Sequence, residues 1–138
     1  MNKIKSRIGG IILLILSIML TAGTKLIFPA CAAHDDGSFM NCHWAEQAVF
    51  GAGLALTAIS LIVLVSGKEK AASGASLALV PIAAITAVIP DILIPLCKMP
   101  MMRCHTAMRP AVIVISCLIA AAALVNAVMI LRKKEENK

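Results

Sequence analysis

The chain has 138 residues, of which 60% are apolar and 14% are charged, and its mean hydropathy is +0.93. Soluble domains are about half apolar, so this composition indicates an integral membrane protein and leaves no room for a separate soluble domain. The net charge of +6 is no sign of nucleic-acid binding, because the basic residues gather at the ends of apolar segments.

Four segments are long enough to cross a bilayer, whose hydrocarbon core needs about 20 apolar residues in a helix. They are residues 8–29, 46–66, 73–95 and 110–131. None alternates polar and apolar residues with the period of a β-strand, and helices satisfy their own backbone groups in lipid. The sequence therefore predicts an all-α membrane protein that folds as a four-helix bundle.

The first segment follows a basic N-terminus and ends at Pro29, since proline does not continue a helix. A secretory signal peptide begins in the same way, but this apolar run is long for one, so we expect an uncleaved helix. An outer loop, 30–45, leads to the second segment. We expect Trp44 to anchor that segment at the membrane interface.

A short cytoplasmic loop, 67–72, precedes the third segment, in which Pro81 and Pro90 predict a kink or a break. A second outer loop, 96–109, leads to the fourth segment. In that segment Cys117 is expected to be a small buried residue. Asn126 is a candidate for a hydrogen bond between helices.

The basic residues predict the topology through the positive-inside rule. Nine of them precede the first segment, separate the second from the third or follow the fourth, and only three lie in the outer loops. The nine are Lys3, Lys5, Arg7, Lys68, Lys70, Arg132, Lys133, Lys134 and Lys138, and the three are Lys98, Arg103 and Arg109. We therefore expect both termini in the cytoplasm and the protein in the prokaryotic cytoplasmic (inner) membrane.

An internal repeat relates residues 1–66 to residues 73–138. The segment that begins at Lys25 matches the one that begins at Asp91, and each reaches a Pro-x-Cys sequence; after a spacer, each half then has Met-x-Cys-His. Both halves start and end on the same side, so we expect parallel helical hairpins related by a pseudo-two-fold axis along the membrane normal.

The loop cysteines predict disulfides, because the outer face of the membrane is oxidising. Pairing Cys31 with Cys42 and Cys97 with Cys104 keeps the repeat, although four cysteines allow three connectivities. Closing loops of this length would stabilise the fold by about 2.5–3 kcal/mol.

Two other interpretations of the same loops remain open. Thiolates together with His43, His105, Met40 and Met102 favour Cu(I), or Zn(II) if the thioethers do not bind. Alternatively, the layout of four helices with a cysteine pair in each outer loop is similar to that of enzymes that pass electrons from dithiols to quinone. Those enzymes carry a reactive Cys-x-x-Cys, which this chain lacks.

Lys25 and Asp91 occupy the same position in the repeat, six residues before its first cysteine. Ionisable groups within a span are usually paired or functional, so one hypothesis is an ion pair between them across the pseudo-axis. In the other interpretation Lys25 extends to the lipid headgroups and Asp91 caps a break after Pro90.

With its paired Met-x-Cys-His motifs, the chain resembles a family of small prokaryotic four-helix membrane proteins described only as a domain of unknown function. The resemblance covers essentially the whole chain. It implies the four-helix topology and, through frequent gene neighbourhood, a link to ABC transporters with large extracytoplasmic permease domains. It rests on Cys31, Cys42, His43, Cys97, Cys104 and His105.

We therefore expect a non-enzymatic accessory protein of an ABC-type permease, with disulfide-linked outer loops and no cofactor. The alternatives are a quinone-linked thiol–disulfide oxidoreductase and a Cu(I)- or Zn(II)-binding protein. The oligomeric state is open.

Overall fold

The computed structural model describes residues 2–27, 29, 36–37, 41–66, 68–96, 98, 101 and 104–136, with the backbone alone for residues 2, 3, 5, 6, 69, 104 and 134. Four α-helices account for most of them: α1 (Asn2–Leu26), α2 (Asn41–Val65), α3 (Glu69–Val88) and α4 (Arg109–Glu136). A π-helical turn, η1 (Cys104–Met108), leads into α4. All four α-helices are long and apolar enough to cross a membrane, so the prediction of an all-α protein with four membrane-length helices is confirmed.

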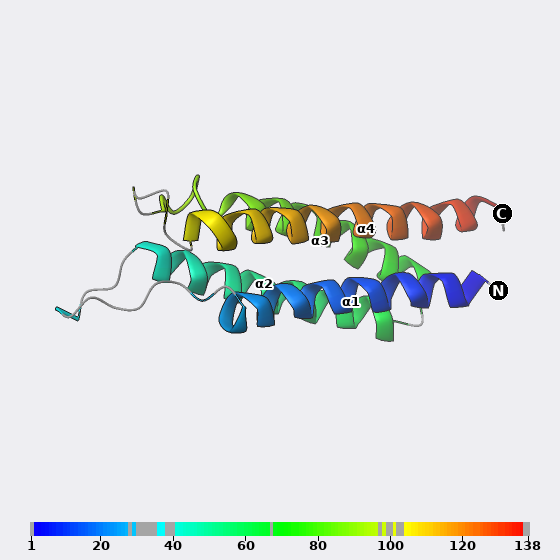
Figure 1. The fold of residues 1–138 in the computed structure, drawn as a ribbon. Helices are drawn as coiled ribbons and strands as arrows, with labels where there is room; N and C mark the ends of the chain where they lie inside the picture. The colour runs from blue at the N-terminus through cyan, green and yellow to red at the C-terminus, as the bar shows by residue number, and fades with distance from the viewer. Residues whose placement is uncertain are drawn as a thin grey trace.

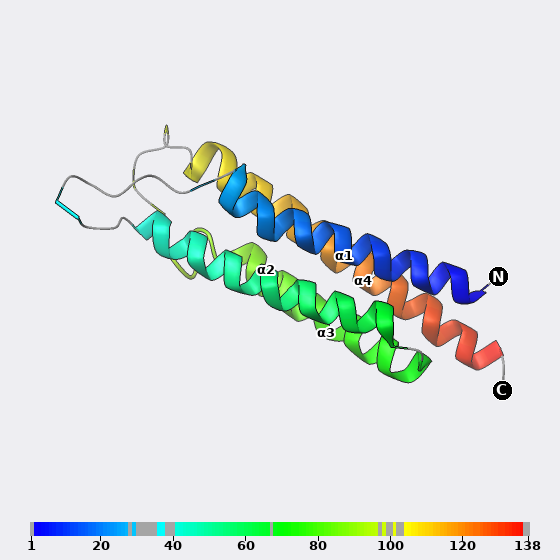
Figure 2. The same cartoon turned by 90° about the horizontal axis from the view of Figure 1, so that it is seen from below.

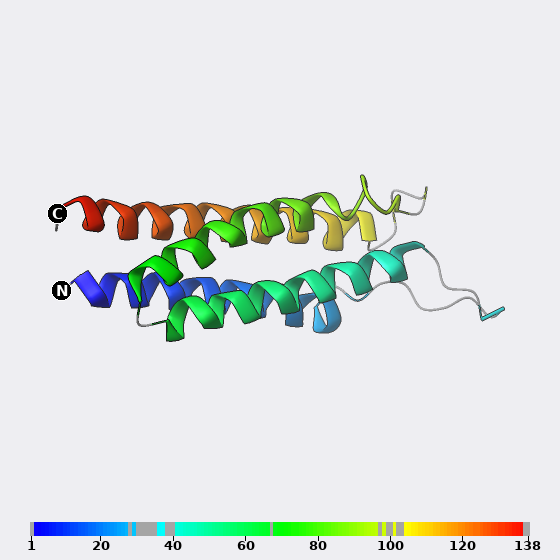
Figure 3. The same ribbon diagram turned by 180° about the vertical axis from the view of Figure 1, so that it is seen from behind.

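Consecutive helices run antiparallel to each other, and the four helices form a ring. Figure 1 shows α1 beside α2 and α3 beside α4, and Figure 2 shows α1 beside α4. Both termini and the α2–α3 connection lie at one end, which we call the terminal end (Figure 3). The last residues of α1 and α3 and the first residues of α2 and α4 lie at the opposite end, the loop end. The pseudo-two-fold relation between the two hairpins stays a prediction.

The third helix ends at Val88, seven residues before the predicted boundary at Pro95. Pro90 has no N–H to donate, and a residue before proline is biased away from helical geometry. Asp91 then adopts a φ of 111°, outside helical geometry, and its N–H donates to the Ile94 carbonyl at 3.2 Å. The break at Pro90 is thus confirmed, whereas Pro81 lies inside α3.

Large apolar side chains fill the axis of the bundle. Leu13, Leu56, Leu79 and Ile119 contribute one fully buried side chain from each helix. Small polar side chains pack between them, and the buried ones include Ser17, Ser60, Ser76, Thr86, Ser116 and Asn126. The interior is therefore a close-packed core.

The outer surface is apolar, the reverse of what a soluble bundle needs. Only 28–33% of the residues in the most apolar window of each helix are buried. Many of the others face outward, and the exposed apolar side chains include Ile11, Ile15, Leu61, Leu77, Val114 and Leu118. Such a surface suits lipid, so the chain is a multi-pass membrane protein. The expectation that Cys117 is buried is wrong, because it lies exposed on α4.

Small and hydroxyl-bearing residues bring α1 and α2 together. A Cβ added to Gly53 would lie 2.6 Å from Thr21 Oγ1, so the two backbones approach closely only because residue 53 is glycine. Next to this contact the hydroxyls of Thr21 and Thr57 lie 3.4 Å apart, and those of Ser17 and Ser60 lie 3.1 Å apart. Each of these hydroxyls also lies within hydrogen-bonding distance of a carbonyl of its own helix.

Asn126 connects three helices near the terminal end. Its Nδ2 donates to Ser76 Oγ at 3.0 Å, which joins α4 to α3. On its other side a Cβ added to Gly9 would lie 2.4 Å from Asn126 Oδ1, so α1 also comes close. The prediction that Asn126 hydrogen-bonds between helices is confirmed.

Candidate functional site at the loop end

An ion pair closes the first hairpin at the loop end. Lys25 lies in the last turn of α1 and Glu46 near the start of α2, and Lys25 Nζ is 2.6 Å from Glu46 Oε1. The side chain of Glu46 is 7% exposed and that of Lys25 is 35% exposed. Lys25 Nζ also lies 5.3 Å from the centre of the Phe50 ring, a distance suited to a cation–π contact.

The dipole of α1 favours Lys25 at this position. A cation is stabilised in the last turn of a helix, and the effect falls off beyond that turn. Lys25 lies in the last turn of α1, so it suits its own helix as well as Glu46, which lies beyond the first turn of α2.

A second ion pair closes the other hairpin with the opposite polarity. Asp91 follows the break after α3, and Arg109 is the first residue of α4. Asp91 Oδ2 lies 2.6 Å from Arg109 Nη2, and each side chain is 42% exposed. In the first hairpin the base lies on the first helix and the acid on the second. In this hairpin the acid follows the first helix, α3, and the base lies on the second, α4.

The hypothesis of an ion pair between Lys25 and Asp91 needs correction, because the structure gives each residue a different partner. The physical reason is the order of the helices around the ring. α1 packs against α2 and α4, and α3 packs against the same two helices. The ends of α1 and α3 therefore lie across the ring from each other, and each charge pairs within its own hairpin.

The first Cys-His pair lies at the start of α2. Cys42 is fully buried, His43 is half-buried, and Trp44 is 60% exposed. The rings of His43 and Trp44 pack edge to face, with centroids 6.1 Å apart. An exposed tryptophan at this end of a membrane helix suits the interface between lipid and water.

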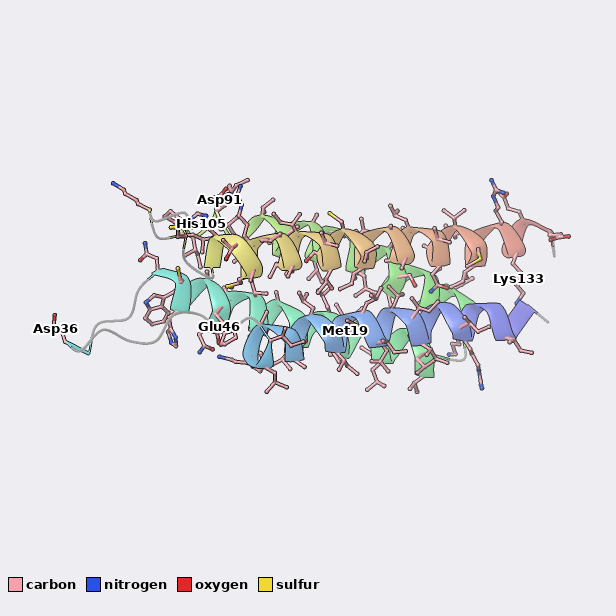
Figure 4. All side chains as sticks on the ribbon, in the orientation of Figure 1. Met19, Asp36, Glu46, Asp91, His105 and Lys133 are labelled. Carbon is pink, nitrogen blue, oxygen red and sulfur yellow. The ribbon has the colours of Figure 1, made fainter. Side chains whose placement is uncertain are left out.

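The second Cys-His pair lies in η1. His105 is half-buried, and Met108 at the end of the same turn is buried. Figure 4 shows His105 and Asp91 at the loop end, with Glu46 at the same end on α2. Both imidazoles thus belong to the end of the bundle that carries the two ion pairs.

Most of the predicted cysteine and methionine ligands fall outside the described residues. These are Cys31, Met40, Cys97 and Met102, while Cys104 is described by its backbone only. The predicted disulfides and the predicted metal site therefore stay predictions. Within the described part of the chain, no group of three or more His, Cys, Asp or Glu side chains could hold a metal ion.

Sequence reasoning missed the partners of both ion pairs, Glu46 and Arg109. The signal was present, because each lies at the boundary where an outer loop enters a span. The repeat drew attention to Lys25 and Asp91 at matching positions. The repeat does not indicate that each of these residues pairs with an oppositely charged residue on the next helix of its own hairpin.

Residues 13–129 match the model of a family described as a domain of unknown function, DUF4418. The chain belongs to this family. No curated protein and no solved structure matches it. The family match spans α2 and α3 entirely, most of α1 and α4, and the four residues of the two ion pairs.

Proposed function

We propose that the protein is a non-enzymatic accessory subunit of an ABC-type transporter and contacts the permease through its loop end. The observation that carries the proposal is the pair of ion pairs at that end. Each outer loop leaves and re-enters the bundle beside one of them. A loop whose two ends are fixed in this way is suited to present a defined contact surface.

The packed interior favours an accessory role for this protein over a role as the transport path itself. Leu13, Leu56, Leu79 and Ile119 occupy the axis of the bundle from four sides. In this account the substrate path belongs to the permease, and the bundle holds the outer loops against it. Disulfides between Cys31 and Cys42 and between Cys97 and Cys104 would stiffen those loops further.

The distribution of charge supports an orientation with the loop end outside the cell. The terminal end carries Arg7, Lys68, Lys70, Arg132 and Lys133 among its described side chains. The positive-inside rule assigns such an end to the cytoplasm. We therefore propose the prokaryotic cytoplasmic (inner) membrane, with both termini inside.

The contact is testable by photocrosslinking in living cells. A photoreactive amino acid replaces Trp44 at the loop end, and a control carries it at Ile11, which is exposed on α1 toward the terminal end. We expect the probe at residue 44 to crosslink an ABC permease identified by mass spectrometry, and the probe at 11 to give mainly lipid adducts. Equal capture from both positions, or capture of no permease from position 44, would contradict the proposal.

The two alternatives make different chemical demands on the same loops. A Cu(I) or Zn(II) site needs reduced thiols and imidazoles that converge on one ion. A quinone-linked oxidoreductase needs a cysteine pair that exchanges with an external dithiol and passes the electrons to quinone. The accessory role needs only stable disulfides, so the oxidation state of the loop cysteines separates the three.

A further inference from the structure

An open groove of about 510 Å³ lies on the outer surface between α1 and α4. Its volume falls within the range of about 300–1,000 Å³ that is usual for ligand pockets. The walls are apolar and include Ile8 and Ile12 from α1 and Val125 and Met129 from α4. Figure 2 shows these two helices side by side, with the chain termini at one end.

The bottom of the groove is set by two residues that let the helices touch. Gly9 and Asn126 both line it, and a side chain at residue 9 would collide with Asn126. Asn126 is 1% exposed, and its Oδ1 is a buried acceptor without a hydrogen-bond partner among the described residues. The close contact at Gly9 therefore gives the groove a floor in the region nearest the terminal end.

The length of the groove matches one leaflet of a bilayer. On α4 the lining runs from Leu118 to Met129, which at ~1.5 Å per residue is ~16 Å of helix. One leaflet is about half of the ~30 Å hydrocarbon core. A transmembrane helix of a partner would need a groove along the full core, so the dimensions favour a lipid chain.

Basic side chains lie where the groove meets the terminal end. Arg132 and Lys133 follow Met129 by three and four residues, one helical turn, and so continue the same face of α4. Arg132 is exposed and Lys133 is half-buried. Figure 4 shows Lys133 directed from the end of α4 toward the start of α1. Glu136 follows one turn later, three residues after Lys133 and four after Arg132, and so also neighbours the two cations.

We propose that this groove holds an anionic phospholipid, with one acyl chain between α1 and α4 and its phosphate beside Arg132 and Lys133. Clusters of basic residues beside membrane helices are typical of sites for anionic headgroups. The apolar walls take the chain, and the two cations at the open end select the charge of the headgroup. The site lies away from the loop end and does not depend on the proposed function.

The headgroup preference is measured by native mass spectrometry of the full chain, with phosphatidylglycerol and phosphatidylcholine in competition. We expect phosphatidylglycerol to be retained about thirtyfold more strongly, since each of two cations near the phosphate contributes about a factor of five. The variant Arg132→Gln/Lys133→Gln should lose most of this preference. The control Lys68→Gln/Lys70→Gln removes two exposed cations at the same end and should keep it.

A second pair of variants tests the groove itself. Ala121→Trp fills it, whereas Ala58→Trp adds the same bulk on the exposed face of α2. We expect about tenfold weaker retention of phosphatidylglycerol in the first variant and no change in the second, with unchanged helical circular dichroism in both. Equal retention of the two lipids by the unmodified chain would overturn the proposal. Equal loss of phosphatidylglycerol retention in the two tryptophan variants would also overturn it, as would equal loss of the headgroup preference in the two charge variants.

Discussion

At the scale of single residues, the contact between α1 and α2 depends on the absence of a side chain at Gly53. The two glycines of α2 provide a direct comparison. A Cβ at residue 53 would meet Thr21 Oγ1 at 2.6 Å and Thr21 Cα at 3.3 Å, whereas a Cβ at Gly51 would meet nothing within 4 Å. The backbone atom of Thr21 does not move aside as a side chain can, so α1 itself must shift.

Gly53→Ala should therefore lower the free energy of unfolding by about 1–3 kcal/mol, the usual cost of overpacking. Gly51→Ala should leave it unchanged or raise it by up to about 1 kcal/mol, since alanine is the better helix former. Unfolding in mixed micelles, followed by circular dichroism, measures both. The same loss for both alanines would contradict the packing of α1 on α2.

Glu46 is the second residue whose surroundings fix its role. Its side chain is 7% exposed, whereas Asp91 of the other ion pair is 42% exposed. Lys25→Met removes the cation beside the buried carboxylate of Glu46 and should lower the free energy of unfolding by about 2–4 kcal/mol. Arg109→Met breaks the exposed pair and should lower it by about 1 kcal/mol or less. If the second variant lost as much as the first, the burial of Glu46 would not be the cause.

At the scale of the elements, the opposite polarity of the two ion pairs specifies which helices form a hairpin. Lys25 and Arg109 lie on the adjacent helices α1 and α4. Glu46 lies on α2, and Asp91 follows the end of α3, the helix adjacent to α2. Like charges on adjacent helices repel each other. The four residues therefore favour pairing within each hairpin and disfavour exchange of partners between hairpins.

This arrangement predicts a specific rescue. Lys25→Glu places two acids together and should lower the free energy of unfolding, and Glu46→Lys in the same chain should restore most of the loss. Asp91→Lys should not restore it, because Asp91 pairs with Arg109. The comparison uses the same micelle unfolding assay. Rescue by Asp91→Lys and not by Glu46→Lys would contradict this arrangement and support the ion pair between Lys25 and Asp91 that the repeat suggests.

The helices were predictable from the sequence because lipid demands long apolar segments, and all four were found. The ends of the helices were less predictable. α3 stops at Val88 because Pro90 and the positive φ of Asp91 end it, although the apolar run continues to Pro95. The ion pairs were not predictable from the repeat alone, since matching positions in sequence say nothing about which helices are adjacent. Glu46 and Arg109 become evident only when the order around the ring is known.

At the scale of the whole molecule, both termini and the α2–α3 connection share one end of the bundle. The proposed orientation puts this end in the cytoplasm, and a membrane-impermeant maleimide tests it in intact cells. Asp36→Cys, in the first outer loop, should be labelled before lysis, and Lys70→Cys, at the start of α3, only afterwards. The unsubstituted chain supplies the background from its own cysteines. Labelling in the reverse order would invert the topology and the proposed contact with it.

The account of the loop end as a disulfide-stiffened contact surface is tested most directly by the state of its cysteines. The measurement is the intact mass of the protein, purified without reductant and alkylated in denaturant so that neither lipid nor packing shields a thiol, before and after reduction. Elemental analysis of the native protein for copper and zinc accompanies it. We predict that Cys117 alone is alkylated before reduction, that all five cysteines are alkylated after it, and that neither metal is bound. Loop thiols alkylated without reduction, together with stoichiometric copper or zinc, would contradict the account and make the paired Cys-His motifs a metal site.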